Sequence, residues 1–207
     1  MIRAVRLTRT AQTGPWKIMT RSGFLAFALA VGLVPLTLPG VASAAKSDSC
    51  AHCHGTDGNS SSSAYPNLAG QTPQYLVKQI TDFKEGRRKN PMMSPAVGVL
   101  SAQEIQELAD YFSSQILSRS TFQTEPAIVA QGKQLAEQAK CVACHQAGYK
   151  GLKEFPRLAR QKYPYLVKQL KDFRDGARTN DNGAMAASVK DLTDEQIQAL
   201  AQYLTSL

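Results

Sequence analysis

Histidine and cysteine are scarce in this chain of 207 residues, which contains three histidines and four cysteines. All of them lie in two short segments, residues 50–54 and 141–145. No cysteine is therefore left to build a disulfide framework. No histidine is left for a catalytic role elsewhere in the chain either, so we expect the chemistry of the protein to centre on these two segments.

Both segments have the pattern C-x-x-C-H, formed by Cys50, Cys53 and His54 and again by Cys141, Cys144 and His145. The pattern is typical of covalent haem attachment: each thiol adds to one vinyl group of the porphyrin, and the histidine becomes an axial iron ligand. A dithiol redox pair usually accompanies a βαβ pattern, which is not visible here. Two C-x-x-C pairs that share one structural zinc normally lie closer together. The sequence predicts two covalently bound haem c groups, with zinc or dithiol chemistry as the weaker alternatives.

The first 44 residues contain no acidic residue, although the chain has 16. Five basic residues lie in 1–21, an apolar run follows at 24–38, and residues 42–44 form a small-x-small cleavage site. This order predicts a secretory signal peptide, residues 1–44, which is cleaved after Ala44 and directs the protein to the periplasm. An uncleaved anchor is the alternative, but the apolar run is shorter than the roughly 20 residues that span a bilayer.

Removal of this segment changes the charge of the chain. Lysine plus arginine falls from 24 to 19 while all 16 acidic residues remain, so the net charge falls from +8 to +3. Nucleic-acid binding, which the high isoelectric point would suggest, loses its support. A basic cluster after the second haem motif is either solvated surface or a docking site for acidic redox proteins; its members are Lys150, Lys153, Arg157, Arg160 and Lys162.

The chain repeats itself with an offset of 90 residues in its middle part. Residues 75–83 recur without a gap as residues 165–173, and a Pro-x-Leu-Ala segment begins at Pro66 and again at Pro156. A repeat of this length, with one haem motif in each copy, predicts two tandem domains rather than a solenoid. Each copy is short for a hydrophobic core of its own, so we expect a buried haem to complete it.

Every segment of the repeats has the pattern of a helix or a loop, which predicts an all-α fold. Capping boxes at Ser101 and Thr193 precede segments whose apolar residues recur at i, i+3, i+4 and i+7. Thr72 and Pro73 predict the start of another helix, as N-cap and first-turn residue, and Gly86 predicts its end.

Methionine is the expected sixth ligand of each iron, because no spare histidine serves each repeat. Three methionines follow the predicted signal peptide: Met92, Met93 and Met185. Met93 and Met185 each lie seven residues before a matching leucine, in segments expected to be loops. The repeat therefore nominates these two, with Met92 as the alternative to Met93. A thioether ligand favours ferrous iron and so raises the reduction potential.

With these features the chain resembles the dihaem cytochrome c4 family, in which two class I cytochrome c domains are joined in tandem. The resemblance covers essentially the whole chain after residue 44. It rests on the two haem motifs, the Pro-x-Leu-Ala segments, the paired methionines, and the closing helices with Tyr111 and Tyr203. It implies two class I domains, each wrapped around a covalently bound haem. It also implies that the carbonyls of Pro66 and Pro156 accept a hydrogen bond from the two haem-binding histidines.

We expect cytochrome domains at residues 45–118 and 127–207, joined by a polar linker at 119–126. Class I domains open with a helix that packs against the closing helix. The second domain has this helix, but in the first only residues 45–49 separate the predicted cleavage site from Cys50. The opening helix of the first domain is therefore expected to be short or missing, and that domain to be the less stable one.

The resemblance implies a periplasmic electron carrier rather than an enzyme, often in loose association with the membrane. Such a carrier takes electrons from a quinol-oxidising cytochrome bc complex and passes them to a haem-copper oxidase or another periplasmic reductase. Two other functions stay open. The first is the dihaem subunit of an enzyme similar to flavocytochrome c sulfide dehydrogenase, with a flavoprotein partner. A dihaem peroxidase is the least favoured, since it needs an open sixth iron position with acid-base groups beside it.

Overall fold

The computed structural model of the protein describes Gly14 and residues 40–207. Most of the predicted signal peptide, residues 1–13 and 15–39, lies outside the described residues. The described part of the chain consists of helices and loops with one isolated β-bridge, between Leu152 and Phe155, and the all-α fold is confirmed. Its elements are α1 Gly40–His54, α2 Pro73–Lys84, α3 Met93–Val97, α4 Ala102–Ser114, α5 Pro126–Gln138, α6 Val142–His145, the 3₁₀ helix η1 Ala147–Tyr149, α7 Tyr163–Arg174, α8 Ala184–Val189 and α9 Asp194–Ser206.

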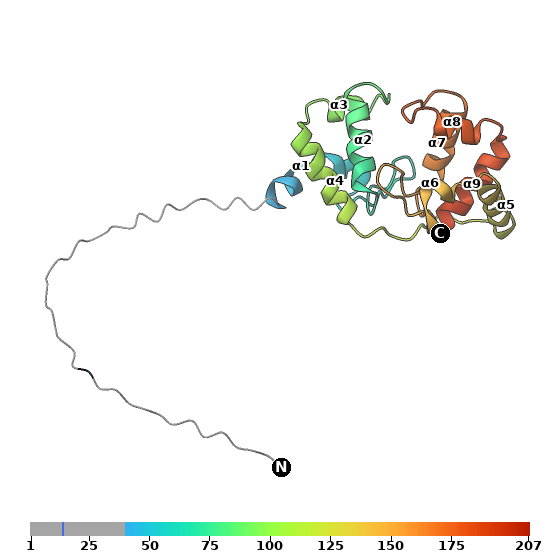
Figure 1. The fold of residues 1–207 in the computed structure, drawn as a ribbon, viewed down its shortest axis with the longest axis horizontal. Helices are drawn as coiled ribbons and strands as arrows, with labels where there is room; N and C mark the ends of the chain where they lie inside the picture. The colour runs from blue at the N-terminus through green and yellow to red at the C-terminus, as the bar shows by residue number, and fades with distance from the viewer. Residues whose placement is uncertain (1–13, 15–39) are drawn as a thin grey trace, which may run out of the picture. The chain divides into compact units, whose positions relative to one another are not determined.

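The two repeats share a common order of helices. In each, a helix with residues of the haem motif (α1 or α6) is followed by a 12-residue helix (α2 or α7), a short helix (α3 or α8) and a closing helix (α4 or α9). The second repeat also has the separate opening helix α5 and the 3₁₀ helix η1. In Figure 1 the helices of the first repeat, blue to lime, and those of the second, yellow to red, form two groups. The long loops that follow the haem motifs meet between these groups.

The closing helices α4 and α9 begin as the sequence predicts. Ser101 Oγ accepts a hydrogen bond from the Glu104 N–H at 3.3 Å, and the Glu104 carboxylate accepts one from the Ser101 N–H at 2.6 Å. Thr193 and Gln196 form the same capping box on α9. The predicted apolar faces are buried; they consist of Ile105, Leu108, Ala109 and Phe112 on α4 and Ile197, Leu200, Ala201 and Leu204 on α9.

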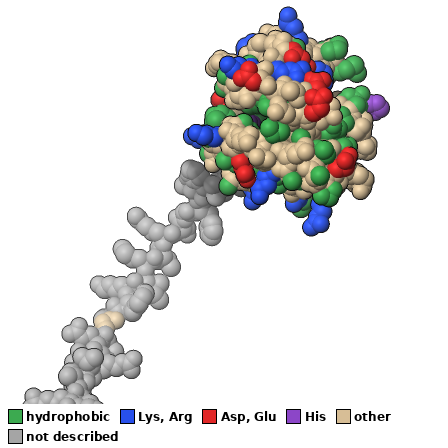
Figure 2. All heavy atoms as spheres, turned by 90° about the vertical axis from the view of Figure 1, so that its right-hand side faces the viewer, with side chains coloured by type: hydrophobic (Ala, Val, Ile, Leu, Met, Phe, Trp, Pro, Cys, Tyr) green, Lys and Arg blue, Asp and Glu red, His purple; other side chains and the backbone are tan. Residues whose placement is uncertain are grey.

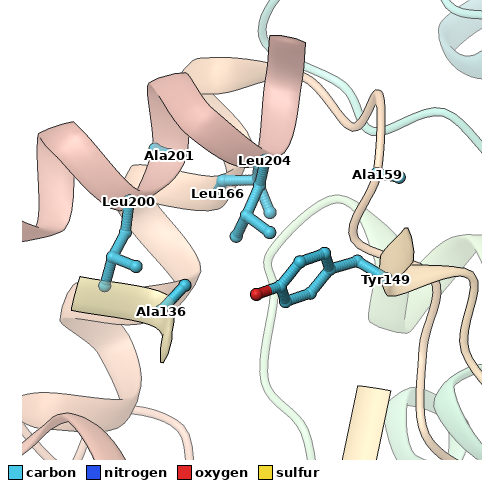
Figure 3. Close-up of a cluster of buried hydrophobic side chains, with 7 residues drawn as sticks. All are labelled: Ala136, Tyr149, Ala159, Leu166, Leu200, Ala201 and Leu204. Atoms are coloured by element: carbon cyan, nitrogen blue, oxygen red, sulfur yellow. The ribbon is translucent and has the colours of Figure 1, made fainter. Parts of the chain in front are cut away.

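The core of the second repeat joins α5, α7 and α9 to the loop after the haem motif (Figure 3). Its buried members are Ala136, Tyr149, Ala159, Leu166, Leu200, Ala201 and Leu204. Figure 3 shows the ring of Tyr149 reaching from the end of η1 toward Ala136 and Leu204. The first repeat has a smaller core, formed by Leu76, Leu108, Ala109 and Phe112. Cores of this size agree with the expectation that a haem completes each of them.

The opening helix α5 packs against the closing helix α9 at Gly132. A Cβ atom at Gly132 would lie 2.0 Å from the carbonyl oxygen of Ala199, so only glycine allows the two backbones to come this close. In the first repeat, α1 packs against α4 and runs through Ala44, after which cleavage is predicted. Cleavage there would leave residues 45–54 of α1, so the shortened opening helix stays a prediction.

The start of α2 shows a difference from the sequence-based expectation. The helix begins at Pro73 as predicted, but the hydroxyl of Thr72 does not cap it. That hydroxyl instead donates to the carbonyl oxygen of Lys153 in the second repeat, at 2.5 Å. Gly86 follows the end of α2 with a φ of +76°, a conformation that favours glycine.

Two buried glutamines join the repeats in matching ways. The side-chain amide of Gln71 accepts from the N–H of Arg157 at 2.7 Å and donates to its carbonyl at 3.0 Å. Gln161, the counterpart of Gln71, makes the same two hydrogen bonds with Asn67, both at 2.8 Å. Because each residue contacts the counterpart of its own partner, an approximate twofold axis relates the contacts of the two repeats.

We expect Gly132→Ala to destabilise the second repeat by about 1–3 kcal/mol, because the added methyl group would overlap the backbone of Ala199 and force α5 away from α9. Gly98→Ala is a matched control, since Gly98 has a helical φ of −58° and its Cβ would approach no atom closer than 3.4 Å. Thermal unfolding of the haem-loaded proteins, followed by circular dichroism, measures both effects. Equal midpoints for the two variants would contradict the close packing.

Candidate haem sites

His54 and His145 end the two C-x-x-C-H motifs, and both side chains are buried. His54 Nδ1 lies 2.9 Å from the carbonyl oxygen of Pro66, and His145 Nδ1 lies 3.0 Å from that of Pro156. A carbonyl oxygen can only accept, so Nδ1 donates and Nε2 keeps its lone pair in each ring. A metal-binding histidine is normally held in this way, with its second nitrogen bonded to an acceptor.

The protonation state of the two histidines also suits iron binding. Burial lowers the pKa of His54 and of His145, and the hydrogen bond to the proline carbonyl opposes this shift without cancelling it. Both rings are therefore neutral near pH 7. Neutral imidazole is the form of histidine that binds metals.

Backbone hydrogen bonds across a loop fix the position of the carbonyl that each histidine uses. In the first repeat, the carbonyl oxygen of Gly58 accepts from the N–H groups of Leu68 and Ala69, at 2.7 and 3.1 Å. In the second repeat, the backbone carbonyl oxygen of Tyr149 accepts in the same way from the N–H groups of the matching pair, Leu158 and Ala159. These bonds hold the Pro-x-Leu-Ala segment across the end of the haem motif, so the proline carbonyl faces the imidazole.

The thiols of Cys50, Cys53, Cys141 and Cys144 are unpaired. Cys144 is exposed and the other three are half-buried. Burial raises the pKa of Cys50 and of Cys141, so both are protonated thiols at neutral pH. Each motif thus presents two free thiols and one oriented, neutral imidazole. This donor set fits a covalently attached haem with one axial histidine.

Met93 and Met185 lie in short helices, not in loops as the sequence suggested. Met93 begins α3 and Met185 is the second residue of α8. The Asn90 side chain accepts from the N–H of Met93 at 3.0 Å, and the Asp181 carboxylate accepts from the N–H of Met185. Both methionines are half-buried, whereas Met92 is 62% exposed. Asn90 also accepts from the N–H of Met92, at 2.9 Å, so it is burial rather than this hydrogen bond that favours Met93 over Met92 as a ligand.

The basic cluster after the second motif is divided between surface and interior contacts. Arg157 Nε donates to the carbonyl of Gly70 at 2.8 Å, and Arg160 Nε donates to that of Leu207 at 3.1 Å. Lys150 and Lys153 are exposed. Figure 2 shows basic and acidic side chains side by side on the face turned to the viewer, rather than in separate patches. This face therefore carries no large patch of one charge.

A set of polar side chains that the sequence does not predict lies between the repeats. We call it the arginine cluster; it consists of Tyr75, Gln79, Arg88, Tyr165, Gln169 and Arg178. Each member of the first repeat recurs in the second with an offset of 90, so a signal was present. A repeat alone does not say which residues face the other copy, and the contact could not be read from it.

Comparisons with known proteins agree with this geometry. Residues 129–207 match the family model described as Cytochrome c, and residues 40–112 match the one described as Cytochrome C oxidase, cbb3-type, subunit III. Cytochrome c4 of Pseudomonas aeruginosa is 37% identical over 187 residues, which cover 85% of this chain and 92% of that protein. The thiosulfate dehydrogenase electron acceptor of Thiomonas intermedia is 37% identical over 169 residues, 76% of this chain and 78% of that protein.

The fold is also that of a solved relative. The crystal structure of reduced recombinant cytochrome c4 from Pseudomonas stutzeri matches with a TM-score of 0.75 at 36% identity, covering 80% of this chain and 97% of that one. The fold, the two C-x-x-C-H sites and the similarity to known cytochromes together define a dihaem cytochrome c. It has two cytochrome c domains and two covalently bound haem c groups. The chain belongs to the cytochrome c4 family and is a dihaem electron carrier of that type. None of the helices in the described part of the chain has the length and apolar character to cross a membrane.

We expect Met93→Ala and Met185→Ala each to open one iron to added ligands such as cyanide, because each removes the half-buried thioether that is expected to be the sixth ligand. Met92→Ala should leave both irons closed, since that side chain is exposed. The weak far-red absorption band of the ferric protein, which reports iron–methionine bonds, should fall to about half in the first two variants. Loss of half the band in Met92→Ala, and none in Met93→Ala, would make Met92 instead of Met93 the sixth ligand of the first repeat.

Proposed function

We propose that the protein is a periplasmic electron carrier that receives electrons from a quinol-oxidising cytochrome bc complex and delivers them to a haem-copper oxidase or another periplasmic reductase. The observation that carries this proposal is the duplicated donor set in a chain of the cytochrome c4 family. The predicted signal peptide supports the periplasmic location. Loose membrane association would suit a donor that oxidises a membrane quinol.

The haem-binding residues of this proposal come from both repeats. The attachment thiols are Cys50, Cys53, Cys141 and Cys144, and the axial ligands are His54, Met93, His145 and Met185. When bound, haem iron supplies one-electron transfer between its ferric and ferrous states. The chain itself sets the conditions of that transfer. The carbonyls of Pro66 and Pro156 orient the imidazoles, and the thioethers of Met93 and Met185 would hold the iron, raise its potential and keep oxygen and peroxide away from it.

A second candidate function is favoured by one of the relatives, which is named a thiosulfate dehydrogenase electron acceptor. In this alternative a redox enzyme reduces the chain directly, as the flavoprotein subunit does in an enzyme of the flavocytochrome c sulfide dehydrogenase type. Both alternatives use the same two haems and differ only in the electron donor. A dihaem peroxidase is disfavoured, because each repeat offers a half-buried methionine for the position that peroxide would need.

The loop after the second haem motif is the proposed contact for an acidic partner. Leu152 and Phe155 are 51% and 48% exposed, and the exposed Lys150 and Lys153 lie beside them in the chain. An apolar centre with a charged rim is typical of transient protein contacts. Such a contact gives fast association that depends on salt.

We expect Lys150→Gln/Lys153→Gln to slow reduction by a purified cytochrome bc complex on the order of tenfold at low salt, and to flatten the salt dependence of the rate. Stopped-flow reduction of the ferric protein measures this rate. Lys190→Gln is the control, since Lys190 is exposed and lies far along the chain from the loop. Reduction by a thiosulfate- or sulfide-oxidising enzyme, with none by the bc complex, would favour the second candidate. Reduction by neither would contradict the proposal.

We expect the first haem site to fail before the second when the processed protein is heated mildly, because cleavage after Ala44 would shorten α1 while α5 stays complete. Mass spectrometry of the exported protein shows whether its chain begins at Ala45. The loss of the two far-red band components on heating then shows the order, with Met93→Ala and Met185→Ala identifying which component belongs to which repeat. Earlier failure of the second site would overturn the expectation.

A further inference from the structure

The segment that connects α4 to α5 is held near both of its ends but not in its middle (Figure 1). Near its start, the side-chain amide of Asn59 donates to the carbonyl of Ile116 at 2.9 Å. Near its end, Phe122 stacks on Tyr163 with ring centroids 4.3 Å apart. Between these anchors, residues 119–121 form no hydrogen bond with any described residue outside the segment.

A pocket of about 340 Å³ borders this middle part of the connecting segment. It is lined by residues 59–61 and Asn67 of the first repeat, residues 118–121 of the segment, and Arg160 and Lys162 of the second repeat. The side-chain amide of Asn67 donates to the carbonyl of Arg160 at 3.2 Å, so the two repeats meet in the pocket wall. A volume of this size suits a small molecule. No cysteine, histidine or methionine of the proposed haem sites lines the pocket.

Three of the lining side chains are cations: Arg119, Arg160 and Lys162. Among the described residues, no acceptor binds the guanidinium of Arg119 or the ammonium of Lys162, and Arg160 uses only its Nε, which donates to the carbonyl of Leu207 at 3.1 Å. Since a guanidinium has five N–H groups, four of those of Arg160 remain for another acceptor. Arg160 and Lys162 are half-buried, so water surrounds them less completely than it surrounds an exposed side chain.

The sequence offers these cations no counter-charge. All 16 acidic residues lie at or after Asp48, within the described part of the chain, and none of them lines the pocket. Three like charges around one pocket repel one another. Burial lowers the pKa of Arg157, and the charge of Arg160 lowers it further, in agreement with a positive potential here. An anion from solution would remove this repulsion.

The backbone of Arg160 shows that its side chain has a purpose at this position. Arg160 has a φ of +62°, and its counterpart in the first repeat, Gly70, has a φ of +61°. Glycine adopts this conformation freely, whereas any other side chain makes it unfavourable. The second repeat nevertheless carries arginine there. Its guanidinium must offset the unfavourable backbone, and the single bond to Leu207 uses only one of its donors.

We propose that this pocket binds a small soluble oxyanion of the phosphate or sulfate class, which accepts hydrogen bonds from Arg119, Arg160 and Lys162. A tetrahedral oxyanion has four oxygens, so it accepts from several charged donors at once. Because the donors come from the connecting segment and from the second repeat, the bound anion fastens residues 119–121 to that repeat. The site is independent of the proposed haem ligands and of the proposed redox partners.

Calorimetric titration of the haem-loaded protein with inorganic phosphate, at an ionic strength kept constant with chloride, tests the site. Arg160→Gly should weaken phosphate binding by about tenfold, because it removes charged donors and leaves the residue that Gly70 shows to suit this backbone. Lys162→Gln should weaken it too, while the bond from Arg160 to Leu207 stays intact. Lys190→Gln is the control, since Lys190 is exposed and does not line the pocket.

Limited digestion with trypsin tests whether the anion fastens the segment. Trypsin cleaves after arginine, and Arg119 is exposed in an irregular segment of the kind that proteases cut. Saturating phosphate should slow cleavage after Arg119 several-fold in the parent protein and in Lys190→Gln, but not in Arg160→Gly.

Three results would overturn the proposal. The first is a parent protein that shows no saturable phosphate binding, and the second is binding that Arg160→Gly and Lys162→Gln leave unchanged. The third is binding without protection of the bond after Arg119, which would reject the fastening of the segment. Haem content and the thermal midpoint are measured on every variant. If Arg160→Gly does not fold, Lys162→Gln decides both experiments.

Discussion

One short backbone segment after each haem motif carries both the orientation of the histidine and the contact between the repeats. Pro66 and Pro156 offer their carbonyls to the histidine Nδ1 atoms. The next residue in each segment, Asn67 or Arg157, is the one that a glutamine of the other repeat binds through its backbone. The imidazole cannot keep its orientation unless this segment stays in place, and the segment is held partly by the other repeat. Haem site and interface are therefore parts of one constraint.

The arginine cluster adds an electrostatic link to this mechanical one. Gln79 and Gln169 each bind guanidiniums of both repeats, so neither charge belongs to one domain alone. The charge of each guanidinium acts strongly on the other, because both are buried and a medium of low dielectric weakens the screening between them.

The features that could be predicted from the sequence depend on residues a few positions apart, such as the capping boxes at Ser101 and Thr193 and the apolar faces behind them. Contacts between the repeats could not be predicted. Thr72 precedes a proline as a typical N-cap residue does, yet its hydroxyl donates to the carbonyl of Lys153, 81 residues away. Arg88 is a charged residue of the kind that is usually solvated, yet it is buried. The short helices at Met93 and Met185 could not be predicted either, because helices of five and six residues are too short to show a hydrophobic periodicity.

The symmetry of the interface contrasts with the difference between the opening helices. Gln71 and Gln161 each bind the backbone of the other repeat through the same two hydrogen bonds. The interface side of the two haem sites is therefore similar. The outer ends of the repeats are not equal. Gly132 brings α5 into backbone contact with α9, whereas α1 begins within the predicted signal peptide and carries the haem motif in its own last turns. The opening helices are therefore a place where the two repeats can differ in stability, although the backbone contacts between them are the same in both directions.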